Sequence, residues 1–334
     1  EHRLPQDGRF KIEGEREHVS IRVSIIPIMD GEKVVMRLLR EEVAGLTLES
    51  LGLEGKALES IRLNLKKPNG LILVTGPTGS GKTTTLYALM DILNTPGVNI
   101  ATVEDPIEYR MPRINQTQVK PEIGLTFAAG LRSLVRQDPD IIMVGEIRDN
   151  ETASLAINAA LTGHLVLSTL HTNSAAGALP RLLDMKVEPF LIASTTNIII
   201  AQRLVRKLCQ DAKESYALDT SEIEALSRVY DMAKLLEVLK EKRIVKKDAS
   251  WESITFWRPK PSRDCPEGYK SRIGIFEVLP MTEKIRKLVT AQATSDEIQD
   301  EGIKEGMTTM FEDGFIKAAK GITSIEEVLR VTKE

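Results

Sequence analysis

The sequence predicts an α/β protein with a mostly parallel, doubly wound sheet, and three observations support this fold class. Between about residue 46 and residue 208, short apolar runs of buried-strand type alternate with amphipathic helical stretches. One of these runs leads into a glycine-rich loop at residues 76–83 and then into a helix. Acidic residues follow two other runs, at the carboxyl ends of the predicted strands, where open α/β proteins bind ligands.

Length and composition indicate how many domains the chain forms and in which compartment it is expected. The chain has 334 residues, enough for two or three domains, with 42% hydrophobic residues and a formal net charge of −3. No apolar stretch approaches the roughly 18 residues of a membrane-spanning helix, and the first residues resemble neither a signal nor a transit peptide. Cys209 and Cys265 are too few for a disulfide framework, so a reducing, cytoplasmic location is expected.

The first segment, residues 1–45, predicts antiparallel strands. Residues 19–25 and 33–39 alternate between apolar and polar side chains, and the turn signal at 29–32 separates them. So short a segment buries little core alone. We therefore expect it to be the end of a small N-terminal domain, followed by the core at 46–208.

Two further segments follow the core. Residues 209–270 predict an inserted subdomain, with helical periodicity at 222–240 and an exposed loop at the proline- and arginine-rich stretch 258–263. Residues 271–334 predict a mostly helical C-terminal region, which begins with a strand-like patch at 273–278.

The glycine-rich loop carries the strongest functional signal. An apolar run at 71–74 precedes it and a helical stretch at 84–90 follows it, which argues against a chance glycine-rich turn. Its glycines allow backbone N–H groups to surround a phosphate, Lys82 reaches the β- and γ-phosphates, and the Thr83 hydroxyl ligates Mg²⁺. The predicted nucleoside triphosphate site comprises Gly76, Pro77, Thr78, Gly79, Ser80, Gly81, Lys82, Thr83 and Thr84.

Acidic side chains follow two other predicted strands. The run at 141–144 is followed by Gly145, where most phosphate-loop proteins have an aspartate, and then by Glu146. The run at 99–103 leads to Glu104, Asp105 and Glu108. A carboxylate at this edge can polarise an attacking water. Glu104 and Asp105 are equally compatible with capping a turn before the following proline.

Two of the four histidines, His164 and His171, flank the strand predicted at 165–170. An extended strand of that length spans roughly 20 Å, so the two rings cannot both touch one phosphate. One can sense the nucleotide while the other braces the loop. Ordinary polar packing is the alternative for both.

Taken together, four stretches resemble the secretion ATPase superfamily, the hexameric motors of type II secretion, type IV pili and type IV secretion. They match, in order, its Walker A motif, Asp box, atypical Walker B motif and His box, and similarity extends over nearly the whole chain. The resemblance implies a RecA-like core preceded by part of a PAS-like α+β domain. The four stretches are residues 76–83, 102–108, 140–149 and 162–172.

The resemblance also implies roles for individual residues. Lys82 and Thr83 would hold the phosphates and Mg²⁺, Glu108 would be the general base, and Glu146 would bind Mg²⁺ or its water. His164 and His171 would couple the γ-phosphate to neighbouring elements. Two arginines of the N-terminal domain would close over the phosphates, although both are equally compatible with a solvated strand face. These are Arg22 and Arg37.

Within the superfamily, the insert resembles that of the pilus-assembly and type II secretion branch. That branch commonly has two C-x-x-C pairs that bind zinc, whereas neither cysteine here has a second one near it, so we expect no zinc site. The resemblance implies a homo-hexamer, an inner-membrane platform protein and a membrane-anchored adaptor as partners. It also implies a cytoplasmic location on the inner face of the cytoplasmic membrane, with ATP and Mg as ligands.

Two other functions share some of these features. A nucleic-acid motor would have the same loop but should show basic stripes or aromatic platforms, whereas only 4% of the residues are aromatic and the charge is balanced. We therefore expect no nucleic-acid partner. A regulator that binds ATP without hydrolysing it would suit the Gly145–Glu146 replacement, but the acids at the strand ends argue against it.

Overall fold

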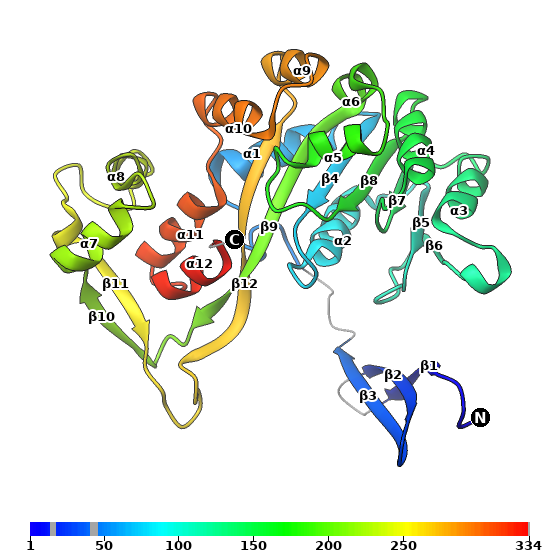
Figure 1. Ribbon diagram of the computed structural model, residues 1–334, viewed down its shortest axis with the longest axis horizontal. Coiled ribbons are helices and arrows are strands. Elements are labelled where there is room, and N and C mark those ends of the chain that lie inside the picture. Colours follow the sequence, from blue (N-terminus) through cyan, green and yellow to red (C-terminus); the bar gives the residue numbers. More distant parts are fainter. Residues whose placement is uncertain (14–17, 41–45, 333–334) are drawn as a thin grey trace.

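The structure, a computed structural model, describes residues 1–13, 18–40 and 46–332. A central sheet with helices on both faces forms the body of the protein (Figure 1). A small three-stranded sheet formed by the N-terminal residues lies apart from this body, and an α/β insert lies beyond the β12 edge of the central sheet (Figure 1).

The small sheet consists of β1 (Gln6–Glu13), β2 (His18–Ile28) and β3 (Gly31–Arg40), paired antiparallel in the order β1-β2-β3. The predicted hairpin is confirmed, with Ile28 opposite Gly31 at its turn. β1 was not predicted: residues 9–13 alternate between polar and apolar side chains, but Asp7 and Gly8 in its first half belong to residue types that are depleted in strands. The predicted boundary after residue 45 falls at the segment 41–45, outside the described residues.

The central sheet confirms the predicted fold class. Six neighbouring strands run parallel, and the long strand β12 pairs antiparallel with β9 at one edge. The order across the sheet is β12-β9-β4-β8-β7-β5-β6. The strands are β4 (Gly70–Thr75), β5 (Ile100–Glu104), β6 (Ile114–Gln118), β7 (Ile141–Val144), β8 (Leu165–Leu170), β9 (Thr196–Leu208) and β12 (Tyr269–Pro280).

Each face of the sheet is covered by helices, so its central strands are apolar on both sides. In β4, Leu71 and Leu73 belong to one hydrophobic cluster while Ile72 and Val74 belong to the other. The second cluster is covered by α1 (Gly55–Leu65) and α2 (Lys82–Leu93). The first is covered by α3 (Phe127–Leu134), α4 (Asn150–Leu161), α5 (Ala178–Asp184) and α6 (Pro189–Thr195). A 3-10 turn, η1 (Pro121–Ile123), precedes α3.

The insert contains a two-stranded sheet, β10 (Lys213–Ala217) and β11 (Thr255–Pro259), and two helices. The predicted helical stretch 222–240 is divided into α7 (Thr220–Ser227) and α8 (Met232–Glu241), because Asp231 caps the second helix through the Lys234 N–H. A 3-10 turn, η2 (Trp251–Ser253), leads to β11. The prediction of a loop at 258–263 is wrong for its first two residues, since Arg258 and Pro259 belong to β11 and pair with β10.

The two cysteines form a disulfide between Cys209 and Cys265, with their Cα atoms 6.7 Å apart. This bond was not predicted, because two cysteines were judged too few for a disulfide framework and a reducing location was expected. Cys209 directly follows β9 and Cys265 lies in the loop that leads to β12, so pairing of these two long strands brings the cysteines together. The bond closes the base of the insert.

The C-terminal region that follows β12 is helical. It contains α9 (Glu283–Thr290), α10 (Ser295–Lys304), α11 (Met310–Ala319) and α12 (Ile325–Thr332). The last two share a hydrophobic cluster with the insert, in which Phe315 of α11 meets Trp251 and Phe256 edge-on. The insert thus has no separate core. No helix among the described residues is long and apolar enough to cross a membrane.

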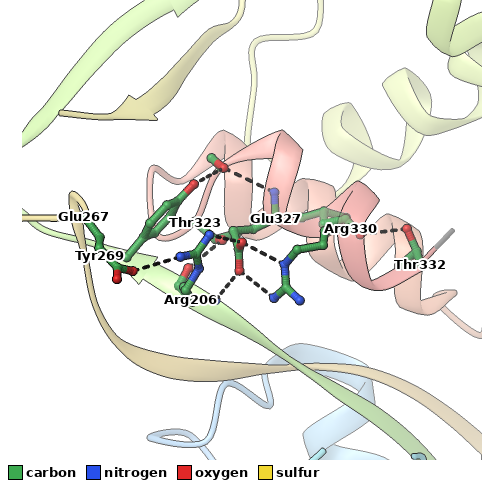
Figure 2. Close-up of polar contacts among 9 residues, drawn as sticks. Arg206, Glu267, Tyr269, Thr323, Glu327, Arg330 and Thr332 are labelled. Carbon is green, nitrogen blue, oxygen red and sulfur yellow. Dashed lines mark hydrogen bonds and ion pairs between the residues drawn. The ribbon is translucent and has the colours of Figure 1, made fainter. Parts of the chain in front are cut away.

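A polar network attaches α12 to the β9–β12 ribbon (Figure 2). Its centre is Glu327, whose side chain is 2% exposed. Arg206 of β9 donates to this carboxylate at 2.7 Å, and Arg330 donates through two nitrogens at 2.9 Å each. Burial alone would raise the pKa of Glu327, but the hydrogen bonds from Arg330 and Arg206 lower it to about 2. The ionised carboxylate therefore stabilises the folded state.

Glu327→Gln is expected to lower the free energy of unfolding by about 3 kcal/mol, because it removes the counter-charge of Arg330 and the buried one of the two carboxylates that pair with Arg206. Since the folded-state pKa of Glu327 is depressed, its contribution is full above the ordinary value of 4.5 and disappears as the pH falls towards about 2. Urea unfolding at neutral and acidic pH measures both effects. The control is Glu326→Gln, whose side chain is 54% exposed. An equal loss of stability in both variants would contradict this role for Glu327.

Candidate nucleotide-binding site

The predicted phosphate loop connects β4 to α2. Gly76 has φ +147°, and a Cβ atom on it would lie 2.4 Å from the carbonyl oxygen of Gln202, so only glycine fits. Gly81, with φ +88°, is the N-cap of α2 and provides no side-chain cap. The first N–H groups of α2 are therefore available to an anion, which the helix dipole also favours.

The side chains of the loop are suited to phosphate. Lys82 Nζ donates to the carbonyl oxygens of Gly76 at 2.8 Å and Pro77 at 3.0 Å, so it is folded back over the loop. Burial lowers the pKa of Lys82, while the nearby Glu146 carboxylate raises it. The buried Ser80 hydroxyl has no hydrogen-bond partner among the described residues. The donor set and the glycine cradle thus fit a triphosphate.

The loop opens into a cavity of about 740 Å³. The cavity wall brings together the loop, the ends of β5 and β7, the residue after β8, and the N-terminal sheet. Of the predicted site residues, those on the wall are Thr78, Gly79, Gly81, Lys82, Thr83, Thr84, Glu108, Glu146, His171 and Arg37.

Glu146 lies just beyond the end of β7 and contacts two cavity residues. Arg148 Nη2 is 2.6 Å from its carboxylate and His171 Nε2 is 3.4 Å from it. Gly145, which precedes Glu146, packs closely, because a Cβ atom there would lie 3.3 Å from the Val103 carbonyl oxygen. This close approach accounts for the glycine at a position where an aspartate was the usual expectation.

Glu104, the last residue of β5, is only 2% exposed. Its carboxylate accepts hydrogen bonds from Tyr87 Oη, from Thr102 Oγ1 at 2.6 Å and from Gln116 Nε2 at 3.0 Å. Burial raises its pKa, although these three hydrogen bonds lower it in part. Glu104 therefore braces the strand end internally and does not cap the turn before the proline.

Glu108 and Asp105 also lie on the cavity wall. Asp105 is exposed, whereas Glu108 is half-buried beside Tyr109. The ring of Tyr109 meets that of Tyr87 edge-on, with centroids 4.4 Å apart. Glu108 thus lies on the wall of the same cavity as the phosphate loop, beside a packed tyrosine pair.

The structure does not bring His164 or Arg22 to the cavity. His164 precedes β8, and its carbonyl oxygen accepts from the N–H of Gly70, where β4 begins. It therefore lies at the end of the sheet opposite the phosphate loop, with its Nδ1 3.0 Å from the Ala159 carbonyl oxygen. Arg22 is exposed on β2, directly opposite Arg37 of β3. We exclude His164 from the site.

Sequence reasoning missed several cavity residues, including Arg148, Arg272 and Phe127. Arg148 had a signal, since it lies within the same ten-residue stretch as Glu146. Arg272 had none, because β12 reaches the cavity edge only through its pairing with β9. The cavity thus contains three arginines among its described lining residues, from β3, β12 and the segment after β7.

The chain is similar in sequence to known proteins over its whole length. A family model described as "Type II/IV secretion system protein" matches residues 1–330. Type II secretion system protein E of Xanthomonas campestris pv. campestris is 51% identical over 334 residues, which cover 100% of this chain and 56% of that protein. The type IV pilus assembly ATPase PilB of Pseudomonas aeruginosa is 44% identical, covering 100% of this chain and 56% of that protein. The chain thus spans little more than half of these relatives.

A crystal structure of the pilus retraction motor PilT with bound ADP has a similar fold. It aligns with a TM-score of 0.69 and 27% sequence identity, covering 99% of this chain and 78% of that one. The fold, the matched family model and the relatives agree, and the chain belongs to the type II/IV secretion system protein family.

Proposed function

We propose that this protein hydrolyses ATP with Mg²⁺ and so powers type IV pilus assembly or type II protein secretion. One observation carries the proposal: a single cavity joins the phosphate loop, the acids at the ends of β5 and β7, His171 and Arg37. Cations, acids and a backbone anion site around one space are what phosphoryl transfer requires.

Each residue has a distinct task in this proposal. Lys82 and the N–H groups of α2 bind the phosphates, while Thr83 and Glu146 hold Mg²⁺, which neutralises charge on the phosphate oxygens when bound. Glu108 takes the proton from the attacking water. Arg37 approaches from the N-terminal sheet and stabilises the charge that develops on the transferring group.

The relatives suggest the setting in which this activity is used. Two of them are named for type II secretion and type IV pilus assembly. We propose a homo-hexamer on the cytoplasmic face of the inner membrane, with a membrane platform protein and a membrane-anchored adaptor as partners and no nucleic acid. Apolar side chains on one face of the N-terminal sheet support contact with a neighbour, since Phe10 is 45%, Met36 60% and Leu38 70% exposed.

The test is ATP hydrolysis as a function of protein concentration, with light scattering on the same samples. We expect specific activity to rise as a six-subunit species appears, because ring contacts would hold the N-terminal sheet, and with it Arg37, in place at the cavity. Constant activity in a persistent monomer would contradict the ring. A verified hexamer without turnover would contradict the enzyme and favour an ATP-binding regulator.

A further inference from the structure

Glu277 of β12 is a buried carboxylate outside the nucleotide cavity. It is 4% exposed, and its neighbours Ile275 and Leu279 on the same face of β12 are fully buried in the main hydrophobic cluster. Burying a carboxylate among apolar side chains is costly unless hydrogen bonds compensate it. Burial raises the pKa of Glu277, which hydrogen bonds from Gln299 and from backbone N–H groups partly offset. Such a residue requires an explanation.

Its hydrogen-bond partners come from three separate segments. The backbone N–H of Ala175 donates to Oε1 at 2.9 Å, and Gln299 Nε2 of α10 donates to Oε2 at 2.9 Å. The backbone N–H of Met310, the first residue of α11, donates as well. These donors are neutral, so the carboxylate forms no ion pair with them. Its hydrogen bonds hold three segments together: the chain around Ala175, α10 and the start of α11.

One of the three segments comes directly from the nucleotide cavity. His171, on the cavity wall, is four residues before Ala175. Four residues of extended chain span at most about 14 Å, so fixing Ala175 restricts where His171 can lie. The segment 171–177 is thus held at its start by the His171–Glu146 contact and near its end by the Ala175–Glu277 hydrogen bond.

We propose that Glu277 is a positioning residue for the nucleotide site: it fixes segment 171–177, and through it His171 and Glu146, and links this segment to α10 and α11. The inference rests on the proposed ATP hydrolysis and adds a residue to it. A displacement of about 1 Å at a reacting group can cost about 100-fold in rate. The C-terminal helices are thereby connected to the nucleotide cavity through Glu277 and segment 171–177.

The chain offers a conservative variant that keeps the connection. In Glu277→Gln, the amide oxygen still accepts from Ala175, and the new NH₂ group faces Gln299. Gln299 Oε1 is buried without a partner among the described residues, so a turned Gln299 amide accepts from that NH₂. Glu277→Leu and Glu277→Ala both remove the hydrogen-bond acceptor. Leucine still fills most of the space of the glutamate side chain, whereas alanine leaves it empty. Gln299→Ala removes the α10 contact and leaves Ala175 bound.

We would measure kcat and KM for ATP in assembled protein, together with the affinity for a fluorescent ATP analogue. Glu277→Leu and Glu277→Ala should lower kcat by about 10- to 100-fold while KM and analogue affinity change by less than about threefold. Glu277→Gln should restore kcat to within about threefold of the wild type, and Gln299→Ala should retain it. Hydrogen exchange of the 171–177 amides should accelerate only in the Leu and Ala variants.

Wild-type kcat in Glu277→Leu, or an equal loss of kcat in Gln299→Ala, would overturn the proposal. So would a Glu277→Gln variant as slow as Glu277→Leu. A wild-type protein that never hydrolyses ATP would instead defeat the proposed function. The hydrogen-exchange comparison still decides in that case whether Glu277 anchors the segment, because it needs no turnover.

Discussion

Glu108→Gln is expected to bind ATP with close to wild-type affinity and to hydrolyse it at least about 100-fold more slowly. The amide keeps the shape of the side chain on the cavity wall, but it cannot accept a proton from the attacking water. In the proposed site, phosphate is bound by other residues, the loop and Lys82. Single-turnover hydrolysis and titration with a fluorescent ATP analogue separate the two quantities.

The matched control is Asp105→Asn, which neutralises another carboxylate on the same wall, three residues away. It should hydrolyse ATP within about threefold of the wild-type rate, because Asp105 is exposed and has no proposed proton-transfer role. Wild-type hydrolysis by Glu108→Gln would place the base elsewhere. Glu146 would then be the first candidate, since three donors already occupy the Glu104 carboxylate.

The features that the sequence predicted correctly depend on neighbouring residues. The run before the phosphate loop became β4 because its side chains are apolar on both faces, and the hairpin followed from alternation around Asp30–Gly31. The parallel order of the sheet follows from strands connected by helices. The separation of His164 from His171 also followed from strand length alone.

The features that could not be predicted from the sequence depend on pairing between distant segments. The disulfide and the position of Arg272 both require β9 and β12 to pair, and no local pattern encodes that register. Likewise, Glu104 and Glu277 are acidic residues within apolar strands, and donors from other elements help to explain why they are buried. The sequence could place acidic residues at the end of a strand, but it could not show which of their side chains are exposed to solvent.

Lys82→Ala is expected to lose both nucleotide binding and turnover. The ammonium group lies over the loop, 2.8 Å from the Gly76 carbonyl oxygen, and the substitution removes the positive charge that is proposed to bind the β- and γ-phosphates. In the wild-type protein, ATP at 100 times its dissociation constant should stabilise the fold by about 2.7 kcal/mol. The variant should lose most of this stabilisation, which thermal unfolding with and without ATP and Mg²⁺ measures.

Lys66→Ala is the control, because Lys66 is an exposed lysine at the end of α1, outside the cavity lining. It should keep both the ATP-dependent stabilisation and the rate. Without ATP, Lys82→Ala should unfold at nearly the wild-type temperature, since the lost hydrogen bonds join only residues of the loop itself. If ATP stabilises Lys82→Ala as much as the wild type, the nucleotide binds elsewhere. In that case the Glu108→Gln result cannot be interpreted as loss of a base, because binding and chemistry would not share this cavity.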